Sequence, residues 1–395
     1  MRLCVLTTSY PRSPEDDAGV FVARLVEALA PRFQGIGVIV PLDHVEPHHE
    51  VRGTIEIFRY RYGLFSRGRV AFGLGIAPNI AQTPALLGQI PGLLIGMFRA
   101  ARRFVRAGDI VLANWLAAGC VGWALYRFFK IPYIVVLRGG DTKLLSAAPR
   151  LFRRVLADAR TVVAVSESLK NAVSESIPTL AGAIQVIGNG VTFSPPSIDE
   201  LAQFLVARGL RKGRYLLFVG SVIPRKRIEI LFEILSTGCL IDYDLVVCGR
   251  IEAGGYRSEL IESARKLGVF DRVRFEGLVP PNEIPLFLAG AAAYLSAADF
   301  EGRPNGLLEA LAAGLPCAAS NIPAHRELIV DGENGLLFEY DDLPGTAQRI
   351  RQLLDDRNRV RTFAVMAQAR VAEYSWERCA ERYRTALLED HKLPR

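Results

Sequence analysis

The 395-residue sequence has few of the residues that mark common catalytic and metal sites. It contains five histidines, and none can be paired with a nucleophilic serine or cysteine. Its six cysteines are scattered without CxxC spacing, which predicts buried, reduced thiols in a cytosolic protein. No G-x-G-x-x-G motif follows the first apolar run. The main signature of a dinucleotide-dependent oxidoreductase is therefore missing.

Long apolar runs are also scarce. The longest, around Ala85–Phe98, is interrupted by a glutamine, a proline and glycines. We expect it to fall short of the roughly 18 to 20 apolar residues of a transmembrane helix. It is followed by a cluster of four arginines, Arg99, Arg102, Arg103 and Arg106. Two interpretations stay open: a core-facing helix with a solvated end, or a helix that lies on an anionic membrane.

Basic residues, by contrast, are in excess. The chain has 48 Lys and Arg against 41 Asp and Glu, a net charge of +7. This balance favours anionic partners such as sugar nucleotides, phospholipid surfaces or nucleic acid. We expect no nucleic-acid partner, because no aromatic–basic recognition motif is present. The length exceeds that of one ordinary core and predicts two domains.

Short apolar runs alternate with helical patterns along the chain. The first series of predicted strands is Leu3–Thr7, Ile36–Val40, Ile110–Ala113, Tyr133–Leu137, Thr161–Val165 and Ile184–Ile187. The second is Tyr215–Val219, Leu245–Cys248, Val273–Phe275, Ala292–Leu295 and Cys317–Ala319. Such alternation predicts an α/β protein with two doubly wound, Rossmann-like domains. Ligands bind beyond the carboxyl ends of strands in such sheets, so we expect the site in a central cleft that the domains face.

Turn and linker residues near Asn189–Leu210 separate the two series. We therefore predict an N-terminal domain over residues 1–195 and a second domain over residues 196–372. The remaining segment, residues 373–395, contains a helical pattern at Trp376–Leu388. We expect this helix to pack back on the first domain.

Two loops that follow predicted strands of the first series contain candidate site residues. Gly19 precedes the helix that is expected from Val20 onward, where it would form a simple turn or let the backbone approach a ligand. The segment Arg138–Gly139–Gly140–Asp141 follows the strand Tyr133–Leu137. It is either a charged surface turn or part of a site.

Two loops of the second series are more informative. The loop from Gly220 places Arg225 and Lys226 before a helix, where a cation and a helix N-terminus bind phosphate together. In the segment EGRPNGLLEALAAG, Glu301 precedes a helix and Glu309 lies within it. Amides at that helix start suit a phosphate, and ionised carboxylates accept hydrogen bonds from sugar hydroxyls. The expected free amide donors are those of Asn305, Gly306 and Leu307.

In this order, the loops resemble those of the GT-B retaining glycosyltransferases of family 4. The resemblance extends over nearly the whole chain. It includes TTSYPR with GVFVARLVEAL, RGGD, VAVSESLK, IGNGV, VGSVIPRK, EGRPNGLLEALAAG, HRELIVDGENGLLF and YSWERCAERY. The most specific element is the pair of glutamates, Glu301 and Glu309, with the residues around them.

The resemblance implies roles for these residues in holding a nucleotide sugar. Lys226 and the amides around Gly306 and Leu307 should hold the donor diphosphate, Glu309 the ribose, and Glu301 the transferred sugar. Gly19 should lie near the donor phosphate and the acceptor, and Asp141 near the reacting sugar. The candidate catalytic residues are Glu301, Lys226, Asp141 and Arg138. The candidate donor-binding residues are Gly19, Gly220, Arg225, Lys226, Asn305, Gly306, Leu307 and Glu309.

The implied reaction is a retaining transfer of sugar from a UDP- or GDP-sugar to a glycan or lipid-linked acceptor. It needs neither a metal ion nor another cofactor. The first half is the acceptor domain in this family, and it contains a basic segment and the apolar stretch described above. The basic residues are Arg59, Arg61, Arg67 and Arg69. These features favour a polyprenyl-linked acceptor and a cytoplasmic enzyme in peripheral contact with the inner face of the membrane.

Two departures from the family pattern leave alternatives open. Ser221 occupies the position of a common arginine, for which Arg225 is a candidate replacement, and Arg138 occupies that of a common histidine. A non-catalytic nucleotide-sugar-binding protein and a nucleotide-sugar epimerase on the same fold are the alternative functions. No metal site is expected: Asp242 and Asp244 lead into a strand, and the spacing of His44, His48 and His49 fits no zinc pattern.

Overall fold

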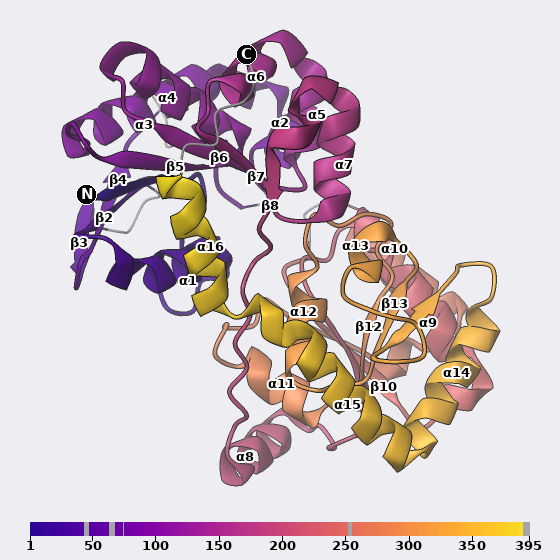
Figure 1. Cartoon of the computed structure of the whole chain (residues 1–395). Helices are drawn as coiled ribbons and strands as arrows, with labels where there is room; N and C mark the ends of the chain where they lie inside the picture. The colour runs from indigo at the N-terminus through magenta and orange to yellow at the C-terminus, as the bar shows by residue number, and fades with distance from the viewer. Residues whose placement is uncertain (43–46, 63–67, 74, 252–254, 390–395) are drawn as a thin grey trace. The chain divides into compact units, whose positions relative to one another are not determined.

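The computed structural model describes residues 1–42, 47–62, 68–73, 75–251 and 255–389 (Figure 1). The chain divides into two compact units. The first comprises Met1–Ser13, Ala18–Gly190 and the chain from Trp376 onward, and the second comprises Pro14–Asp17 and Val191–Ser375. Each unit has its own sheet and its own core.

The first unit is built on an eight-stranded sheet in the order β3-β4-β2-β1-β5-β6-β7-β8, in which only the β3–β4 pair is antiparallel among the described strands. Its strands are β1 (Leu3–Leu6), β2 (Ile36–Pro41), β3 (His49–Arg52), β4 (Ile55–Tyr60), β5 (Ile110–Asn114), β6 (Tyr133–Leu137), β7 (Thr161–Ala164) and β8 (Ile184–Val186). Its helices are α1 (Val20–Leu29), α2 (Ile76–Gln82), α3 (Ile90–Phe104), α4 (Trp115–Phe129), α5 (Asp141–Ala147), α6 (Pro149–Ala157), α7 (Glu167–Ser176) and α16 (Trp376–Leu388).

The second unit has a six-stranded sheet in the order β11-β10-β9-β12-β13-β14, with parallel pairs throughout the described strands. Its strands are β9 (Tyr215–Val219), β10 (Asp244–Cys248), β11 (Val273–Gly277), β12 (Ala293–Ser296), β13 (Cys317–Ser320) and β14 (Leu336–Phe338). Its helices are α8 (Ile198–Arg208), α9 (Ile228–Ser236), α10 (Tyr256–Lys266), α11 (Ile284–Gly290), α12 (Asn305–Ala312), α13 (Pro323–Arg326), α14 (Leu343–Asp355) and α15 (Arg357–Val371).

Both faces of the second sheet are buried. On β9, Leu216 and Phe218 belong to one hydrophobic cluster, whereas Tyr215 and Leu217 belong to another. Successive side chains of a strand point to opposite faces, so helices cover the sheet on two sides. The prediction of two doubly wound, Rossmann-like α/β units is confirmed.

Part of the predicted linker is a helix. Ile198–Arg208 forms α8, although Asn189–Leu210 was expected to separate the domains as turn and linker residues. Ser197 starts this helix: its side chain accepts from the Glu200 amide at 3.2 Å, and the Glu200 carboxylate accepts from the Ser197 amide at 2.9 Å. This reciprocal pair is a capping box, which satisfies two amides at the helix start.

The apolar stretch of the first unit is longer than the sequence indicated. Pro84–Phe104 is one helical stretch of 21 residues, which is long and apolar enough by composition to span a membrane. The expectation that it falls short was wrong. However, Leu93, Met97 and Ala101 of α3 are fully buried in the core of the first unit. One face of α3 is therefore part of a globular core.

The C-terminal helix belongs to the first unit, as expected. Cys379, Ala380 and Tyr383 of α16 are buried in its hydrophobic cluster. The Arg160 guanidinium and the Thr161 hydroxyl donate to the last backbone carbonyls of α16, at 2.9 and 3.2 Å. These bonds satisfy acceptors that a helix end would otherwise leave open.

Candidate active site

Two of the predicted site loops lie side by side in the second unit. β9 lies between β10 and β12, so the chain leaves β9 in one direction towards β11 and returns on the other side of β9 as β12. The carboxyl ends of β9 and β12 therefore form a topological switch point, the usual ligand position in an open α/β sheet. The loop after β9 contains Arg225 and Lys226, and the loop after β12 contains Glu301.

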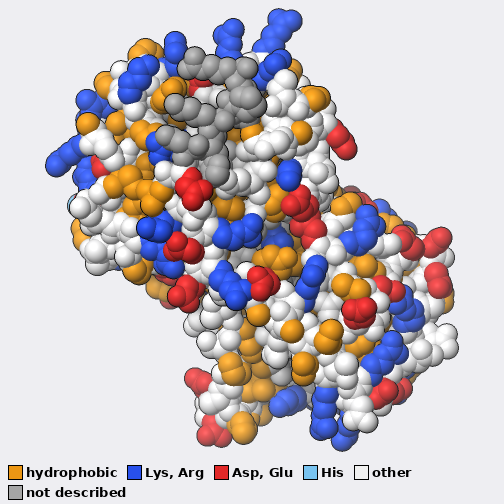
Figure 2. All heavy atoms as spheres, in the orientation of Figure 1, with side chains coloured by type: hydrophobic (Ala, Val, Ile, Leu, Met, Phe, Trp, Pro, Cys, Tyr) orange, Lys and Arg blue, Asp and Glu red, His pale blue; other side chains and the backbone are white. Residues whose placement is uncertain are grey.

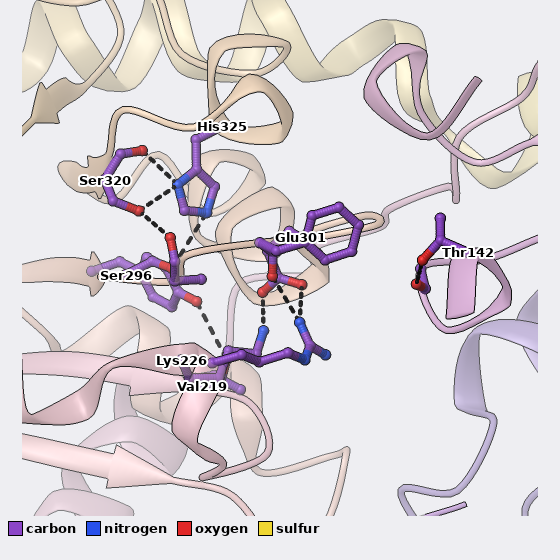
Figure 3. Close-up of polar contacts among 12 residues, drawn as sticks. Thr142, Val219, Lys226, Ser296, Glu301, Ser320 and His325 are labelled. Atoms are coloured by element: carbon purple, nitrogen blue, oxygen red, sulfur yellow. Dashed lines mark hydrogen bonds and ion pairs between the residues drawn. The ribbon is translucent and has the colours of Figure 1, made fainter. Parts of the chain in front are cut away.

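Side chains from the two loops meet in an ion-pair cluster (Figure 3). The Lys226 ammonium contacts Glu301 Oε1, and Arg225 Nη1 lies 3.3 Å from Glu301 Oε2. Arg225 Nη1 also donates to the Phe300 carbonyl at 2.8 Å, and the Asp299 amide donates to the Arg225 carbonyl at 3.0 Å. The cluster therefore holds the loops together and places two cations around one carboxylate.

The contact between Lys226 and Glu301 is shielded from water, whereas the Arg225 side chain is 47% exposed. Glu301 is 5% exposed, and the Lys226 side chain is 13% exposed. Burial, and then the positive charge of Arg225, lower the pKa of Lys226 to about 7. The Glu301 carboxylate opposes this shift, because a negative neighbour stabilises the ammonium. An anionic ligand could take over that role from the carboxylate.

Helix α12 starts directly beyond this cluster, with Pro304 as its N-cap residue. The Asn305 amide donates to the Arg303 carbonyl at 3.0 Å, so the expectation that it is free was wrong. Within the described residues, the Gly306 and Leu307 amides donate to no backbone carbonyl. Two amides at the positive end of the helix are thus available to an anion.

Gly306 lets α12 approach the sheet closely. A Cβ at this position would lie 2.4 Å from the Val219 carbonyl oxygen at the end of β9. Because Gly306 has no side chain, the start of α12 can pack close to the end of β9. The Gly306 and Leu307 amides of α12 therefore lie close to the loop that begins at Gly220. Glu309 follows within the helix and is half-buried.

A buried histidine, His325, was not selected from the sequence and lies in the same unit as the cluster, beside it in the view of Figure 3. His325 Nδ1 donates to the Ser320 carbonyl oxygen at 2.8 Å, and Nε2 lies 3.4 Å from Ser296 Oγ. Burial, and then the charge of Lys226, lower the pKa of His325 to about 4, so the ring is neutral at pH 7. His325 thus ties the ends of β12 and β13 to α13. In the sequence, His325 was marked only as the first residue of HRELIVDGENGLLF, one of the segments that resemble family 4.

Arg138 and Asp141 come together in the first unit, at the end of β6. The Asp141 carboxylate accepts from the backbone amides of Arg138 at 2.8 Å and Leu116 at 3.0 Å. Asp141 is 1% exposed and Arg138 is 6% exposed. The alternative of a charged surface turn is therefore wrong, because both side chains are buried.

Arg138 has amide and aromatic neighbours. Its guanidinium donates to Asn189 Oδ1 and Asn114 Oδ1, each at 3.0 Å, and lies 4.3 Å from the Phe21 ring centroid and 5.5 Å from that of Trp115. Asn114 and Trp115 end β5 and begin α4, and Trp115 has a positive φ of 67°. A positive φ is uncommon for a bulky residue and often accompanies a functional constraint. Neither residue was selected from the sequence.

Gly19 is required by the backbone of the first unit. It has φ 68° at the N-cap of α1, and a Cβ there would lie 2.4 Å from the Ser9 carbonyl oxygen. The left-handed conformation and the close approach both exclude a side chain. The structure thus accounts for this glycine through the turn, one of the two interpretations of the sequence.

The basic segment of the first unit is only partly a surface feature. Arg59 is 4% exposed and pairs with Glu50 at 3.0 Å, so this member of the segment does not add to a basic surface. Arg61 and Arg69 are exposed, and Arg67 lies outside the described residues. His44 also lies outside them, and within them no group of three or more His, Cys, Asp or Glu could hold a metal ion.

Replacing Asp141 by asparagine is expected to flatten the dependence of stability on pH between about 4 and 7. Burial raises the pKa of Asp141 to about 7, against the opposing effects of the Arg138 and Leu116 amides and the Arg138 charge. The folded state thus binds more protons than the unfolded state in this window, and stability falls as pH rises.

At 1.36 kcal/mol per pKa unit, the wild-type protein should lose up to about 4 kcal/mol across this window relative to the Asn variant. Urea unfolding of both proteins at pH 4 and pH 7 measures the difference. Equal changes in the two proteins would contradict the buried, raised carboxyl group.

Two family matches together cover most of the chain. Residues 207–370 match the family Glycosyl transferases group 1, and residues 18–194 match Glycosyltransferase Family 4. The chain is a group 1 glycosyltransferase. The enzyme class predicted from the loops is therefore confirmed.

Curated relatives of this group 1 glycosyltransferase are distant. An uncharacterized glycosyltransferase of Methanocaldococcus jannaschii is 24% identical over 72% of this chain and 77% of its own length. A D-inositol 3-phosphate glycosyltransferase of Salinispora tropica is 28% identical over 74% of this chain and 66% of its own length.

Solved structures share the GT-B fold of this group 1 glycosyltransferase. Sucrose-phosphate synthase of Thermosynechococcus elongatus is 21% identical, covers 97% of each chain and has a TM-score of 0.79. HepE of Anabaena, solved in complex with UDP-glucose, is 19% identical, covers 98% of this chain and 99% of its own, and has a TM-score of 0.76. At such identities the likeness confirms the fold alone.

Proposed function

We propose that this enzyme transfers a sugar with retention from a nucleoside-diphosphate sugar, without a metal ion. The observation that carries the proposal is the meeting of Lys226 and Arg225 with Glu301 beside the start of α12. Two cations and two helix amides supply the positive charge that a departing diphosphate requires. Metal independence follows, because these groups take the place of a divalent cation.

The residues around the cluster have distinct roles in this proposal. Lys226 and the Gly306 and Leu307 amides stabilise the leaving diphosphate, and Glu309 accepts from the ribose hydroxyls. Glu301 accepts from hydroxyls of the transferred sugar. The acceptor attacks from the face that the diphosphate leaves, so retention requires no protein nucleophile.

Lys226 exchanges partners in this scheme. In the structure, the Lys226 ammonium contacts the Glu301 carboxylate. The diphosphate replaces the carboxylate as the partner of Lys226, which frees the Glu301 oxygens for sugar hydroxyls. The contact between Lys226 and Glu301 thus holds both side chains in place before the donor binds, the ammonium for the diphosphate and the carboxylate for the sugar hydroxyls.

The donor nucleotide is proposed to be UDP, whose base is uracil. The HepE structure contains UDP-glucose, and a trehalose-6-phosphate structure of Escherichia coli contains UDP-2-fluoro glucose. These relatives are only 19% and 11% identical to this chain, so a GDP-sugar is tested beside the UDP-sugar.

The acceptor is proposed to be a glycan or lipid-linked molecule that the first unit binds. Arg138 and Asp141 are buried charged residues at the end of β6 in that unit, and they are the residues that we place at the acceptor side of the reaction. Asp141 lies near the reacting sugar in this proposal, and Arg138 affects which sugar is used.

A thermal-shift panel of UDP-, GDP- and ADP-sugars tests the donor site. Ligand at 100 times its Kd should stabilise the protein by about 2.7 kcal/mol, which corresponds to a rise in Tm of roughly 5 to 10 °C for a domain of 150 to 250 residues. We expect the largest rise with a UDP-sugar.

Transfer is then followed with the donor that binds, and the anomeric configuration of the product is read by NMR. Inversion of the anomeric carbon would contradict retention. A panel in which no sugar nucleotide raises Tm would contradict the donor site itself.

A further inference from the structure

The positive charge of the chain is concentrated in one segment of the first unit. Residues 57–140 contain eleven Lys and Arg but only one acidic residue, Asp109, so this segment alone has a net charge of +10 in a chain of net charge +7. The rest of the chain is slightly acidic. Asp109 is 5% exposed and pairs with Arg2 at 2.6 Å, so it does not offset the arginines at the surface.

Within this segment, α3 has apolar side chains on two faces. One face is the buried one described above. On the other side, Leu87 of the preceding 3-10 turn Pro84–Gln89 is 60% exposed and Ile95 is 51% exposed. Only 17% of the most apolar window of this 21-residue stretch is buried. Isolated exposed apolar residues are ordinary, but a stripe that continues along a helix marks an interaction surface.

The end of α4 extends the stripe with aromatic side chains. Phe128 is 75% exposed and Phe129 is 42% exposed. The Phe129 ring lies 6.3 Å from that of Phe98 on α3, and the Arg102 guanidinium lies 4.4 Å from the Phe129 centroid. The two helices therefore form one continuous surface. We call it the α3–α4 surface and define it by Leu87, Ile95, Phe98, Arg102, Phe128 and Phe129.

Basic side chains border this surface. Arg99, Arg103, Arg127 and Lys130 are exposed on the same two helices or directly after them. On α4, Trp123 Nε1 donates to the Asp158 carboxylate at 2.8 Å. Figure 2 shows Lys and Arg side chains among hydrophobic ones in the region that Figure 1 labels α3 and α4. Exposed aromatic residues with a basic border complement an anionic lipid surface, in both apolar content and charge.

We propose that the α3–α4 surface docks on an anionic lipid bilayer. The inference rests on the lipid-linked acceptor of the proposed function and locates the membrane contact on named residues. The protein lies on the bilayer and does not span it, because Leu93, Met97 and Ala101 on the other side of α3 are committed to the core. Phe128 and Phe129 insert at the level of the headgroups, and the arginines contact lipid phosphates.

Flotation with lipid vesicles tests the docking. The full-length protein should bind vesicles of phosphatidylcholine with 30% phosphatidylglycerol, and should bind pure phosphatidylcholine much more weakly. Binding should weaken when salt is raised from about 0.1 M to 0.5 M, because screening shortens the range of the charge attraction.

Two double variants separate the apolar and charged parts. Arg99→Gln with Arg103→Gln should raise the lipid concentration for half-binding about 25-fold, at roughly 5-fold for each basic residue near an anionic surface. Phe128→Ser with Phe129→Ser should weaken binding to both vesicle types at least about 10-fold. Ile198→Ser with Val206→Ser is the matched control on α8, where these side chains are 88% and 81% exposed, and should bind like the wild type.

Three results would overturn the inference. They are absence of binding to anionic vesicles, equal binding of the variants and the wild type, and a dimer in sedimentation that the Phe128→Ser, Phe129→Ser variant loses. The last would assign the surface to a second copy of the chain. The thermal shift with sugar nucleotides is measured on the same proteins without lipid, so failure of docking is distinguishable from failure of the proposed function.

Discussion

Replacing Lys226 by methionine should lower kcat/KM for the nucleotide sugar by about 10- to 100-fold at least, because a charge-assisted hydrogen bond contributes roughly 1.5–3 kcal/mol. The loss should be larger if the ammonium acts chiefly on the leaving diphosphate in the transition state. Initial rates with the donor found in the thermal-shift panel measure the effect. Wild-type turnover in this variant would contradict the site.

The same variant should unfold more easily. Loss of one partner of a buried pair costs about 3–5 kcal/mol when the other charge is left unpaired, and here Arg225 remains to offset part of that cost. In a double-mutant cycle, Lys226→Met with Glu301→Gln should therefore be more stable than Lys226→Met alone.

The exposed pair of Lys266 and Glu262, at 2.8 Å, provides the control. Lys266→Met should change stability by no more than about 0.5 kcal/mol, because exposed i,i+4 pairs contribute little. Urea unfolding of the four proteins of the cycle and of the control measures these differences. Additive effects of Lys226→Met and Glu301→Gln would show that the contact does not couple the two residues.

Replacing Gly306 by alanine should damage both stability and donor binding. The added Cβ would lie 2.4 Å from the Val219 carbonyl oxygen and 2.7 Å from the Tyr294 hydroxyl, so α12 must move away from β9. Forced repacking of this kind costs about 1–3 kcal/mol. The Gly306 and Leu307 amides move with the helix, and we expect roughly a tenfold loss of donor affinity for an error near 1 Å.

Gly238→Ala is the matched control for this change. A Cβ at Gly238 meets no atom within 4 Å, so the substitution should be neutral or slightly stabilising. Urea unfolding reports the stability of each variant, and the thermal shift with sugar nucleotide reports donor binding. A Gly306→Ala protein within about 0.5 kcal/mol of wild type would contradict the close approach of α12, because the clash is expected to cost at least about 1 kcal/mol.

The strands that form the middle of each sheet could be predicted because they are buried on both faces. β1, β5 and β6, for example, consist of buried residues, so each appears in the sequence as an apolar run. β3 was missed because it is an edge strand whose side chains are mostly exposed and therefore have no apolar pattern. β4 was missed although it is an interior strand, because Glu56 and Arg59 interrupt its apolar residues and its buried positions largely alternate with half-buried ones.

The site could be predicted only where a loop itself contains the chemistry. Lys226 and Glu301 lie in the loops that follow β9 and β12, and the sheet order of a doubly wound fold brings these two loops together. His325 lies near Lys226 within the second unit, and Asn114 and Trp115 lie against Arg138 within the first unit, through tertiary packing that no local spacing encodes. The burial of Arg138 was missed for the same reason, because its partners Asn114 and Asn189 are 24 and 51 residues away in sequence.

The place of α16 has a consequence for how the chain is made. Ala380 and Tyr383 complete the core of the first unit, yet the whole of Val191–Ser375 is translated before them. The second unit can therefore fold on the ribosome while the first still waits for its last helix. Until α16 is made, part of the apolar surface around α1 and β6 stays uncovered. We therefore expect the nascent first unit to be more prone to aggregation than the second.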